Sequence, residues 1–479
     1  MTNDDLQRYE AKQGGTFNDV DLEYTFALDL MPVRDRDGHA LGTSSVFSYV
    51  ANVPSERWPA RPVVFIFNGG PGASSAFLHL SGIGPKRMAI PTDLSQGIRP
   101  PYVVEDSTHS LLDTADLVFV DPVDTGFGRA FADVDTDELF SVEGDARYFA
   151  DIITEWIARH DRWNSPKHVL GESYGTQRAP FLAAALMQLR PVPLDGIILL
   201  GQAINVQETR ERPGNVVGAV AALPFQAATA WHHGLGSRQH RSVADAVDVA
   251  LDFAYGDYAV ALLKGNTLPD AQREIVAKQL ETITGIRASY YLKKGLYVSK
   301  PEFLRELLAE RGQVLGTNDS RYVAAATTKS AGEAEFDPSG TYLRPAFTAG
   351  ASRYIHGTLD VPFTTDYRLL DMNAVARWDW SDAGSNNFMQ MGKPSPFHTY
   401  PYVARLTQFL KQAPEARVFI GTGYYDGLTT VGAVEHLLRQ YDIPRDRVVS
   451  HRYAGGHMMY TDPESAVQLT TDLRAFLRR

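Results

Sequence analysis

A serine stands in a short turn whose composition is typical of a nucleophile. Residues 171–175 read GESYG; an apolar run precedes them, and the helical pattern TQRAPFLAAALMQL follows them. Such a G-x-S-x-G turn is strained and lifts the serine hydroxyl clear of a sheet, and its glycines are needed because neighbouring backbones approach closely. We expect Ser173 to be a nucleophile, although a serine at this place could instead only cap the helix.

A serine nucleophile needs a base, and histidine is the most frequent one. His457 lies in the glycine-rich stretch YAGGHMMYTDPES, between a predicted strand and the last predicted helix, where such a base belongs. The other two histidines after residue 400 fit less well, since His436 lies in a helical pattern and His451 in a strand-like run. We expect His457 to be the general base; an ordinary histidine of a surface loop is the alternative.

The base in turn needs a carboxylate that orients it. Asp426 follows the strand-like run RVFIGTGYY and precedes the helical pattern GLTTVGAVEHLLRQY, whereas Asp442 and Asp446 lie in a polar turn. The chain order serine, acid, histidine is that of hydrolases with a G-x-S-x-G turn. We expect Asp426 to be the orienting acid; its alternative role is to cap the helix that follows.

The charge that develops on a substrate oxygen must be stabilised by backbone N–H groups. Tyr174, directly after the serine, is expected to supply one of them. The glycine-rich loop FNGGPGASS follows an earlier apolar run, and we expect Gly70 to supply the other, with Gly69 allowing the backbones to approach. A plain turn is the alternative for this loop.

Short apolar runs that end in turns supply the elements that must position these groups. Such runs occur within residues 61–75, 115–128, 167–175, 195–205 and 415–427. They alternate with helical patterns, and continuous apolar runs are typical of strands buried on both faces. The sequence therefore predicts an α/β fold with a central mixed, mostly parallel sheet, and the candidate residues lie at the carboxyl ends of its strands, where ligands bind.

The middle of the chain differs from the rest, because helical segments dominate and no apolar strand-like run appears in residues 206–375. We expect this segment to form a mostly helical cap insertion. Residues 1–205 and 376–479 are then the catalytic core. Within the core, residues 20–52 alternate apolar and polar around DRDGH, which predicts antiparallel strands.

The composition limits the possible classes of function. The 479 residues include no cysteine, which excludes disulfides, thiolate metal sites and a cysteine nucleophile. The formal net charge of −11 argues against binding of nucleic acid. No run of about 18 apolar residues that could span a membrane is present, and no signal peptide is visible. We expect a cytoplasmic protein, or a periplasmic or secreted one if a leader precedes this sequence, and no metal or organic cofactor.

Five motifs together resemble those of the serine carboxypeptidases, peptidase family S10. They are NGGPGASS, PVDTGF, GESYG, GTGYYDG and GGHMMYTDP, in the family's order and spacing, and GESYGTQR and LHLSGIGPKRM look most like the bacterial branch. The resemblance implies an α/β-hydrolase fold and a serine-type carboxypeptidase that removes C-terminal residues from peptides with a free C-terminus through an acyl-enzyme. By motif, it implies the roles named above for five residues: Ser173, His457, Asp426, Gly70 and Tyr174.

The resemblance also implies a site for the substrate's terminal carboxylate. Family members bind it partly through the asparagine of NGG and the glutamate before the nucleophile, here Asn68 and Glu172. A purely structural carboxylate, paired with Arg178, is the alternative for Glu172. Many secreted family members carry glutamates shortly before the Gly-Pro of this segment, where Ser81 and Gly82 stand here, and a second carboxylate would raise the pKa of Glu172. Without it, we expect a pH optimum less acidic than the family norm.

Two questions stay open at the level of the sequence. Asp124 in PVDTGF stands where the family usually has a glycine, and the sequence gives no reason for it. The same triad could also serve an esterase or acyltransferase acting on a non-peptide acyl donor. A non-catalytic binding protein is a third possibility, which no feature of the sequence supports.

Overall fold

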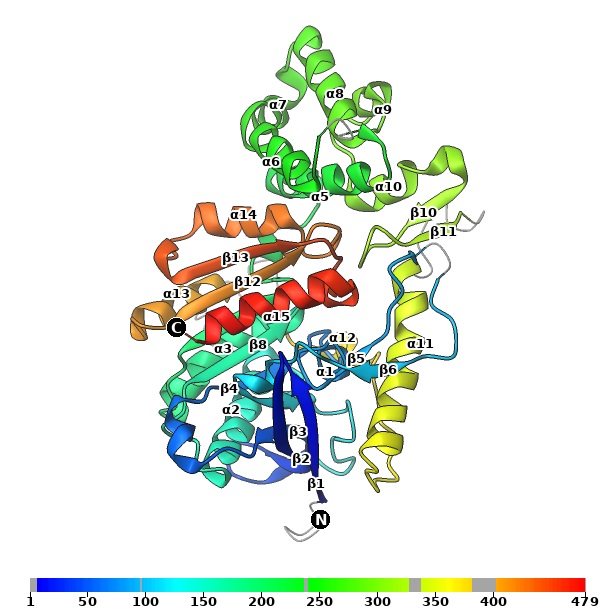
Figure 1. The fold of residues 1–479 in the computed structure, drawn as a ribbon. Helices are drawn as coiled ribbons and strands as arrows, with labels where there is room; N and C mark the ends of the chain where they lie inside the picture. Colours follow the sequence, from blue (N-terminus) through cyan, green and yellow to red (C-terminus); the bar gives the residue numbers. More distant parts are fainter. Residues whose placement is uncertain (1–6, 95–96, 237–239, 327–336, 381–401, 479) are drawn as a thin grey trace.

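The fold is built on a nine-stranded sheet within the residues that the computed structural model describes, 7–94, 97–236, 240–326, 337–380 and 402–478 (Figure 1). The strands lie in the order β1-β2-β3-β7-β4-β8-β9-β12-β13. Their bounds are β1 (Arg8–Phe17), β2 (Val20–Arg34), β3 (Ala40–Ala51), β4 (Val63–Phe67), β7 (Asp116–Val120), β8 (Lys167–Glu172), β9 (Gly196–Leu200), β12 (Arg417–Gly423) and β13 (Val448–Tyr453). Two short pairs lie apart from this sheet: β5 (Lys86–Met88) with β6 (Val104–Asp106), and β10 (Gln313–Leu315) with β11 (Val323–Ala325).

The sheet is mixed and mostly parallel. Strands β7, β4, β8, β9, β12 and β13 run parallel to one another, and β1, β2 and β3 join them antiparallel at one edge. The predicted α/β-hydrolase architecture is confirmed. In β4, Val64 and Ile66 face one hydrophobic cluster while Phe65 and Phe67 face the other. A continuous apolar run is what a strand covered on both faces requires.

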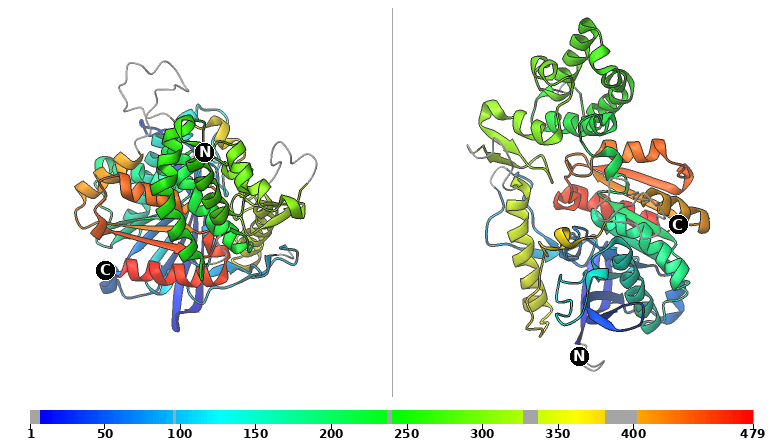
Figure 2. Two further views of the ribbon diagram at one scale, coloured as in Figure 1. Left: turned by 90° about the horizontal axis from the view of Figure 1, so that it is seen from above. Right: turned by 180° about the vertical axis from the view of Figure 1, so that it is seen from behind.

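Helices cover both faces of this sheet (Figures 1 and 2). On one face, Trp156 of α2 packs edge-on against Phe65, with 5.5 Å between the ring centroids. On the other face, Leu469 and Leu473 of α15 belong to the hydrophobic cluster that includes Phe419 of β12. The helices of the core are α1 (Ala76–His79), α2 (Val142–Arg159), α3 (Tyr174–Leu189), α12 (Ala374–Arg377), α13 (Tyr402–Gln412), α14 (Val431–Gln440) and α15 (Pro463–Leu477).

A helical lobe stands above the sheet in Figure 1 and has its own hydrophobic cluster, which includes Phe225, Leu280 and Phe303. The lobe contacts the core where its helix α5 packs against α14. The two backbones are so close that a β-carbon at Gly432 of α14 would lie 2.2 Å from the carbonyl oxygen of Ala221 of α5. Its helices are α4 (Val206–Thr209), α5 (Val216–His232), α6 (Val243–Phe253), α7 (Ala259–Lys264), α8 (Asp270–Thr284), α9 (Ala288–Lys293) and α10 (Lys300–Glu306).

Helix α11 (Pro338–Ser352) runs along the core beside β5 and β6 (Figure 1). Its Leu343 and Phe347 belong to the hydrophobic cluster on one face of the sheet, and not to the cluster of the lobe. The segment 206–375, expected as one cap, therefore divides: its first part forms the lobe, and its described residues from 337 on pack largely against the core. Helical spacing alone does not separate these two parts, because an apolar stripe looks the same whether it faces a lobe or a sheet.

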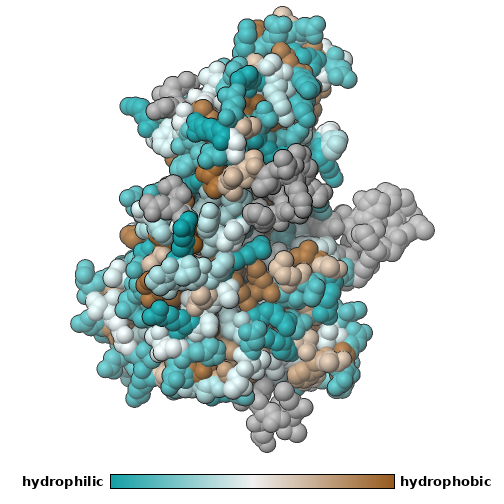
Figure 3. All heavy atoms as spheres, turned by 90° about the vertical axis from the view of Figure 1, so that its right-hand side faces the viewer, coloured by the Kyte–Doolittle hydropathy of each residue, from teal (hydrophilic) through white to brown (hydrophobic). Residues whose placement is uncertain are grey.

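The face that carries α11 shows apolar side chains only in small, separate patches among hydrophilic ones (Figure 3). Among the helices of the described ranges, none is both long enough and apolar enough to cross a membrane.

Candidate active site

Ser173 occupies the turn between β8 and α3, at the carboxyl end of a central strand. Its φ is 59° and its ψ is −123°; a non-glycine residue in such a sparsely populated region costs about 1–3 kcal/mol, and such strain gathers at functional sites. Gly171 permits the turn, because a β-carbon there would lie 2.2 Å from the carbonyl oxygen of Gly175. The Ser173 side chain makes no capping hydrogen bond to the described helix α3, so a simple capping role is not what the structure shows.

His457 and Asp426 form a buried pair on two loops that follow β13 and β12. The Nδ1 atom of His457 lies 2.8 Å from Oδ2 of Asp426. Oδ1 of Asp426 accepts the backbone N–H groups of Leu428 and Thr429, at 2.8 and 2.9 Å. Asp426 therefore orders its own turn and also contacts the imidazole, whereas the alternative role expected for it, the cap of the following helix, belongs to Thr430. With Nδ1 engaged, Nε2 is the ring nitrogen that remains for a reacting hydroxyl.

The two partners shift each other's pKa in opposite directions, because each stabilises the charged form of the other. Burial alone would raise the pKa of Asp426, but His457 and the hydrogen bonds from Thr429 outweigh burial and lower it. Burial alone would lower the pKa of His457, but the Asp426 carboxylate beside it outweighs burial and raises it to about 9. The acid thus stays ionised and stabilises an imidazolium that forms on His457.

Thr429 is a residue that the sequence analysis missed. Its hydroxyl donates to Oδ2 of Asp426, the oxygen that also contacts His457, and it lies 3.2 Å from Nδ1 of His457. The Thr429 hydroxyl therefore holds one oxygen of the Asp426 carboxylate, Oδ2, while the backbone N–H groups of the turn hold the other, Oδ1. Its position three residues after the acid in YYDGLTT was the only available signal.

The backbone of His457 is held by segments far away in the sequence. The N–H of His457 donates to the carbonyl oxygen of Asn318 at 2.6 Å. The N–H groups of Thr317 and Asn318 donate to Oδ2 of Asp337 at 3.0 and 2.7 Å, and Asp337 also caps α11. Asp337 therefore connects the start of α11 with the loop that positions the imidazole.

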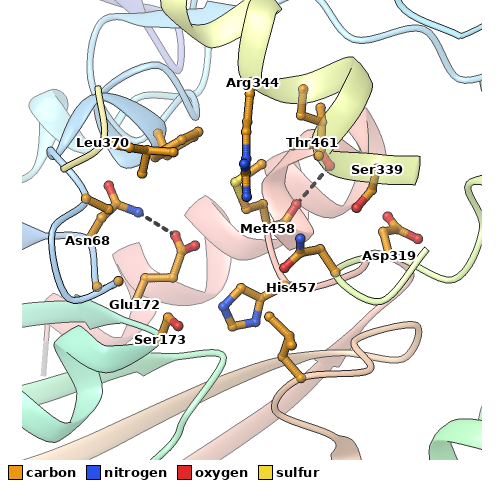
Figure 4. Close-up of a pocket in the computed structure, with 18 residues that line it drawn as sticks. Asn68, Glu172, Ser173, Asp319, Ser339, Arg344, Leu370, His457, Met458 and Thr461 are labelled. Carbon is orange, nitrogen blue, oxygen red and sulfur yellow. Dashed lines mark hydrogen bonds between the residues drawn. The ribbon is translucent and has the colours of Figure 1, made fainter. Parts of the chain in front are cut away.

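Ser173 and His457 line one cavity of about 280 Å³ (Figure 4). The core supplies Asn68 and Glu172 to its wall, and α11 supplies Arg344. Figure 4 shows the imidazole next to the Ser173 side chain. No hydrogen bond between the Ser173 hydroxyl and His457 occurs among the described residues, and such bonds are often long until a substrate binds. The structure thus brings the three expected triad residues to one site.

The two expected oxyanion donors also come together. Gly70 lines the cavity, and Gly69 lies against the backbone of the serine turn at Tyr174. Within the described residues, the amides of Gly70 and Tyr174 have no hydrogen-bond acceptor. Tyr174 begins α3, so its amide belongs to the positive end of the helix dipole. Both N–H groups are therefore available to a negatively charged oxygen.

Glu172 and Asn68 form the second part of the site. The Nδ2 amide of Asn68 donates to Oε2 of Glu172 at 3.0 Å, and the hydroxyl of Tyr460 donates to the same oxygen at 2.7 Å. Arg178 does not pair with Glu172; it contacts Asp145 at 2.6 Å. The structural ion pair considered for Glu172 is therefore absent. No local pattern in the sequence points to Tyr460, which lies 288 residues from its partner.

The protonation of Glu172 has a cause that the sequence analysis did not anticipate. Burial raises the pKa of Glu172 to about 7, against the opposing effects of His457 and the hydrogen bonds from Tyr460 and Asn68. A second carboxylate in place of Ser81 or Gly82 is thus not needed to raise the pKa of Glu172, because burial does so. The less acidic pH optimum stays a prediction, and a carboxyl group with this pKa keeps its proton up to neutral pH.

The structure explains Asp124, where the resemblance implied a glycine. Its φ is 64°, in the left-handed region that favours glycine and that aspartate tolerates better than most residues. Its carboxylate accepts the N–H of Ala130 at 3.0 Å, and its carbonyl oxygen accepts a hydrogen bond from Arg368 at 3.1 Å. Asp124 therefore orders its own loop.

One cluster among the described residues has ligand atoms close enough together for a metal ion: Asp35, Asp37 and His39, between β2 and β3. Asp35 already accepts the N–H groups of Asp37 and His39, each at 2.8 Å, and all three residues lie at a surface turn. Turn geometry explains this cluster without a metal ion.

Comparisons with known proteins agree with this geometry. The model of the serine carboxypeptidases matches residues 41–217, which contain Asn68 and the serine turn. Over this segment, the chain is similar to the serine carboxypeptidases. The pheromone-processing carboxypeptidase KEX1 of Colletotrichum graminicola is 32% identical over 28% of this chain and 20% of its own length. Serine carboxypeptidase-like 33 of Arabidopsis thaliana is 31% identical over 33% of this chain and 32% of its own length.

The relationship to the serine carboxypeptidases thus covers about a fifth to a third of those curated relatives, and Asp426 and His457 lie outside the segment matched by the family model. Solved structures are more distant. A carboxyl esterase from Bacillus coagulans is 12% identical, with a TM-score of 0.37 over 94% of this chain and 97% of its own. A proline iminopeptidase of Mycobacterium smegmatis is 15% identical, with a TM-score of 0.35 over 94% and 97%. The fold assignment therefore rests on the strand order.

Proposed function

We propose that this chain is a serine-type carboxypeptidase, which removes C-terminal residues from peptides with a free C-terminus. One observation carries the proposal: Asn68 and Glu172 contact each other at the wall of the cavity that also holds Ser173 and His457. A protonated carboxyl group beside an amide can donate hydrogen bonds to a carboxylate. An esterase that ignores the end of the chain has no use for such a pair.

The acylation step uses the triad in the order that its contacts suggest. The Oγ atom of Ser173 attacks the carbonyl carbon of the last peptide bond, and Nε2 of His457 takes the hydroxyl proton. Asp426 holds the Nδ1–H group of the imidazolium. The carbonyl oxygen becomes an oxyanion, which accepts the N–H groups of Gly70 and Tyr174. The C–N bond then breaks, and Nε2 gives its proton to the leaving amine.

Deacylation repeats the same steps with water. The acyl group stays on Ser173 after the C-terminal residue leaves. Nε2 of His457 takes a proton from a water molecule, whose oxygen attacks the acyl carbon. The bond to Oγ then breaks, the proton returns to Oγ, and the shortened peptide leaves with a new carboxylate. The triad and the two backbone amides thus account for every proton transfer and every bond change in both steps.

The contact between substrate and the Asn68–Glu172 pair sets which bond is cut. When the terminal carboxylate binds there, the peptide bond next to it is the one that comes within reach of Ser173. Proximity of this kind accounts for a large part of enzymatic rate enhancement. The expected activity is therefore removal of single residues from the C-terminus, without cleavage inside the peptide.

A mixture of N-blocked peptides, each as free acid and as amide, tests the proposal when its digest is followed by mass spectrometry. We expect stepwise loss of residues from the free acids and at most slow reaction of the amides. Ser173→Ala should reduce hydrolysis to about 10³–10⁴ times the uncatalysed rate. Equal cleavage of amides and esters by the unaltered chain would favour the esterase or acyltransferase instead.

We also propose that the chain belongs to the bacterial branch of the family. The motifs GESYGTQR and LHLSGIGPKRM support this assignment, as does the absence of cysteine from the 479 residues. A family tree built on the core motifs would test it, and a position among cysteine-containing secreted members would contradict it. Fractionation of the source cells would show whether the protein is cytoplasmic, periplasmic or secreted.

A further inference from the structure

The cavity wall contains a cation that the proposed chemistry does not use. Arg344 lines the cavity, and Figure 4 shows its side chain pointing from α11 into it. The backbone carbonyl oxygen of Arg344 accepts a hydrogen bond from Thr348, but its guanidinium has no hydrogen-bond or ion-pair partner within the described residues. A guanidinium carries five N–H donors in a fixed planar fork, so an unpaired one at the wall of a ligand cavity is suited to a planar anion.

The acids of the cavity already have other partners, so Arg344 is not needed to neutralise them. Asp319 pairs with Arg321 at 2.7 Å, and Arg321 also contacts Asp462 at 3.0 Å. Glu172 accepts from an amide and a hydroxyl, as described above. The described acids that line the cavity therefore leave Arg344 available to an anion of the ligand.

Arg344 lies on the side of the cavity that would receive the C-terminal residue. Helix α11 packs on α1 through Phe347 and Phe77, whose ring centroids are 5.1 Å apart. The next residue of α1, Leu78, donates its N–H to Oδ1 of Asn68 at 3.0 Å. The element that carries Arg344 is thus joined through α1 to the expected binding group for the terminal carboxylate.

Apolar residues on the same side shape the space around this cation. Phe77, Leu343 and Leu370 line the cavity with Arg344. Arg344 itself is an exposed residue, so water screens part of the attraction between its guanidinium and an anion. A side chain that branches from the residue held at Asn68 would meet these apolar groups and could present a carboxylate to the guanidinium.

We propose that Arg344 selects substrates whose C-terminal residue is aspartate or glutamate, by binding the side-chain carboxylate of that residue. This inference rests on the proposed carboxypeptidase function. A neutral side chain leaves the guanidinium without its anion, and a lysine or arginine side chain is repelled. The substrates are thus peptides with acidic C-terminal residues.

The kinetic test compares two N-blocked dipeptides that differ only in charge, one ending in glutamate and one in glutamine. We expect kcat/KM to favour glutamate by about tenfold or more, the usual effect of one charge-assisted contact. Arg344→Gln should bring the ratio near unity, and Arg344→Lys should keep part of it. A ratio near one in the unaltered chain would overturn the inference while leaving the proposed function intact.

Arg353→Gln is the matched control, because it removes the same charge at the end of α11 from an exposed residue outside the cavity lining. It should leave the glutamate-to-glutamine ratio unchanged; an equal loss of preference would reveal a general charge effect and contradict a specific contact. The same two dipeptides with an amidated C-terminus show whether Arg344 binds the side-chain carboxylate or the terminal carboxylate. If Arg344→Gln lowered the rates for both free acids equally and spared the amides, Arg344 would bind the terminal carboxylate instead, which overturns the assignment to the side chain.

A binding measurement separates failure of this inference from failure of the proposed function. Ser173→Ala, with and without Arg344→Gln, is titrated with the same two dipeptides by calorimetry. We expect the glutamate dipeptide to bind about tenfold more tightly, and only when Arg344 is present. This preference without any hydrolysis by the unaltered chain would refute the carboxypeptidase and support the anion site, whereas equal binding of both dipeptides would refute the anion site.

Discussion

A β-carbon at Gly69 would lie 2.4 Å from the amide nitrogen of Tyr174 and 2.6 Å from the carbonyl oxygen of Glu172. The glycine-rich loop after β4 therefore touches the backbone of the serine turn directly. This contact sets the separation of the two amides, at Gly70 and Tyr174, to which we assign the oxyanion. Any side chain at position 69 must push the loop and the turn apart.

Gly69→Ala is therefore expected to reduce kcat by about 10²-fold, comparable to loss of one oxyanion donor. The substrate-binding pair Asn68 and Glu172 flanks the same contact, so KM should rise as well. Steady-state kinetics on one free-acid peptide would measure both constants. Gly14→Ala is the matched control, because a β-carbon there has no neighbour nearer than 3.7 Å in an edge strand. Similar kcat values for the two variants would contradict the contact.

Thr429 should contribute to catalysis by holding the Asp426 carboxylate against the imidazole of His457. Thr429→Val removes the hydroxyl that donates to Oδ2 of the acid while keeping the shape of the side chain. We expect kcat to fall about tenfold, the effect of about 1.4 kcal/mol, with KM nearly unchanged. Thr429→Ser should restore most of the activity. Thr282→Val, on an exposed helix surface, is the control, and a larger loss there would reject this role.

The protonation of Glu172 predicts how activity depends on pH. The neutral carboxyl group donates to the substrate's terminal carboxylate, and loss of its proton places two anions side by side. With the pKa of Glu172 raised to about 7 by burial, kcat/KM for free-acid peptides should fall as the pH rises through neutrality. Glu172→Gln donates at every pH, so this decline should disappear.

The measurement is the ratio of kcat/KM for a free-acid peptide to that for its ester, from about pH 5 to about pH 9. The ester lacks the terminal charge and reports changes in the triad alone, so the ratio isolates Glu172. A ratio that stays constant over this range in the unaltered chain would show that Glu172 does not bind the carboxylate in its neutral form.

Local patterns in the sequence predicted the sheet because each central strand is covered on both faces. In β4, all five residues had to be apolar, and the run could be recognised without knowledge of its neighbours. The position of α11 could not be predicted in this way. Its Leu343 and Phe347 form an ordinary apolar stripe, and only the folded chain shows which hydrophobic cluster they join.

The same distinction holds for the candidate site. Ser173, Asp426 and His457 stand in turns rich in glycine directly after strands, so each could be proposed from its own neighbourhood. Tyr460 and Asp337 could not, because their contacts with Glu172 and with the loop at Asn318 join segments without a local pattern. The pKa of Glu172 depends on how deeply its carboxyl group is buried, and this burial cannot be predicted from the residues around position 172.

The last prediction concerns stability and the ion pair beneath the site. Arg178 and Asp145 are fully buried, and Arg178 also donates to the carbonyl oxygen of Asn68 at 2.9 Å. Removing one partner leaves a buried charge without compensation, so Asp145→Asn should lower the free energy of unfolding by about 3–5 kcal/mol. Urea denaturation followed by near-UV circular dichroism would measure it. Asp151→Asn breaks a pair with Arg190 that is partly exposed, and should cost less than about 1 kcal/mol. If the two variants unfolded at the same urea concentration, the buried pair would not support the loop that carries Asn68.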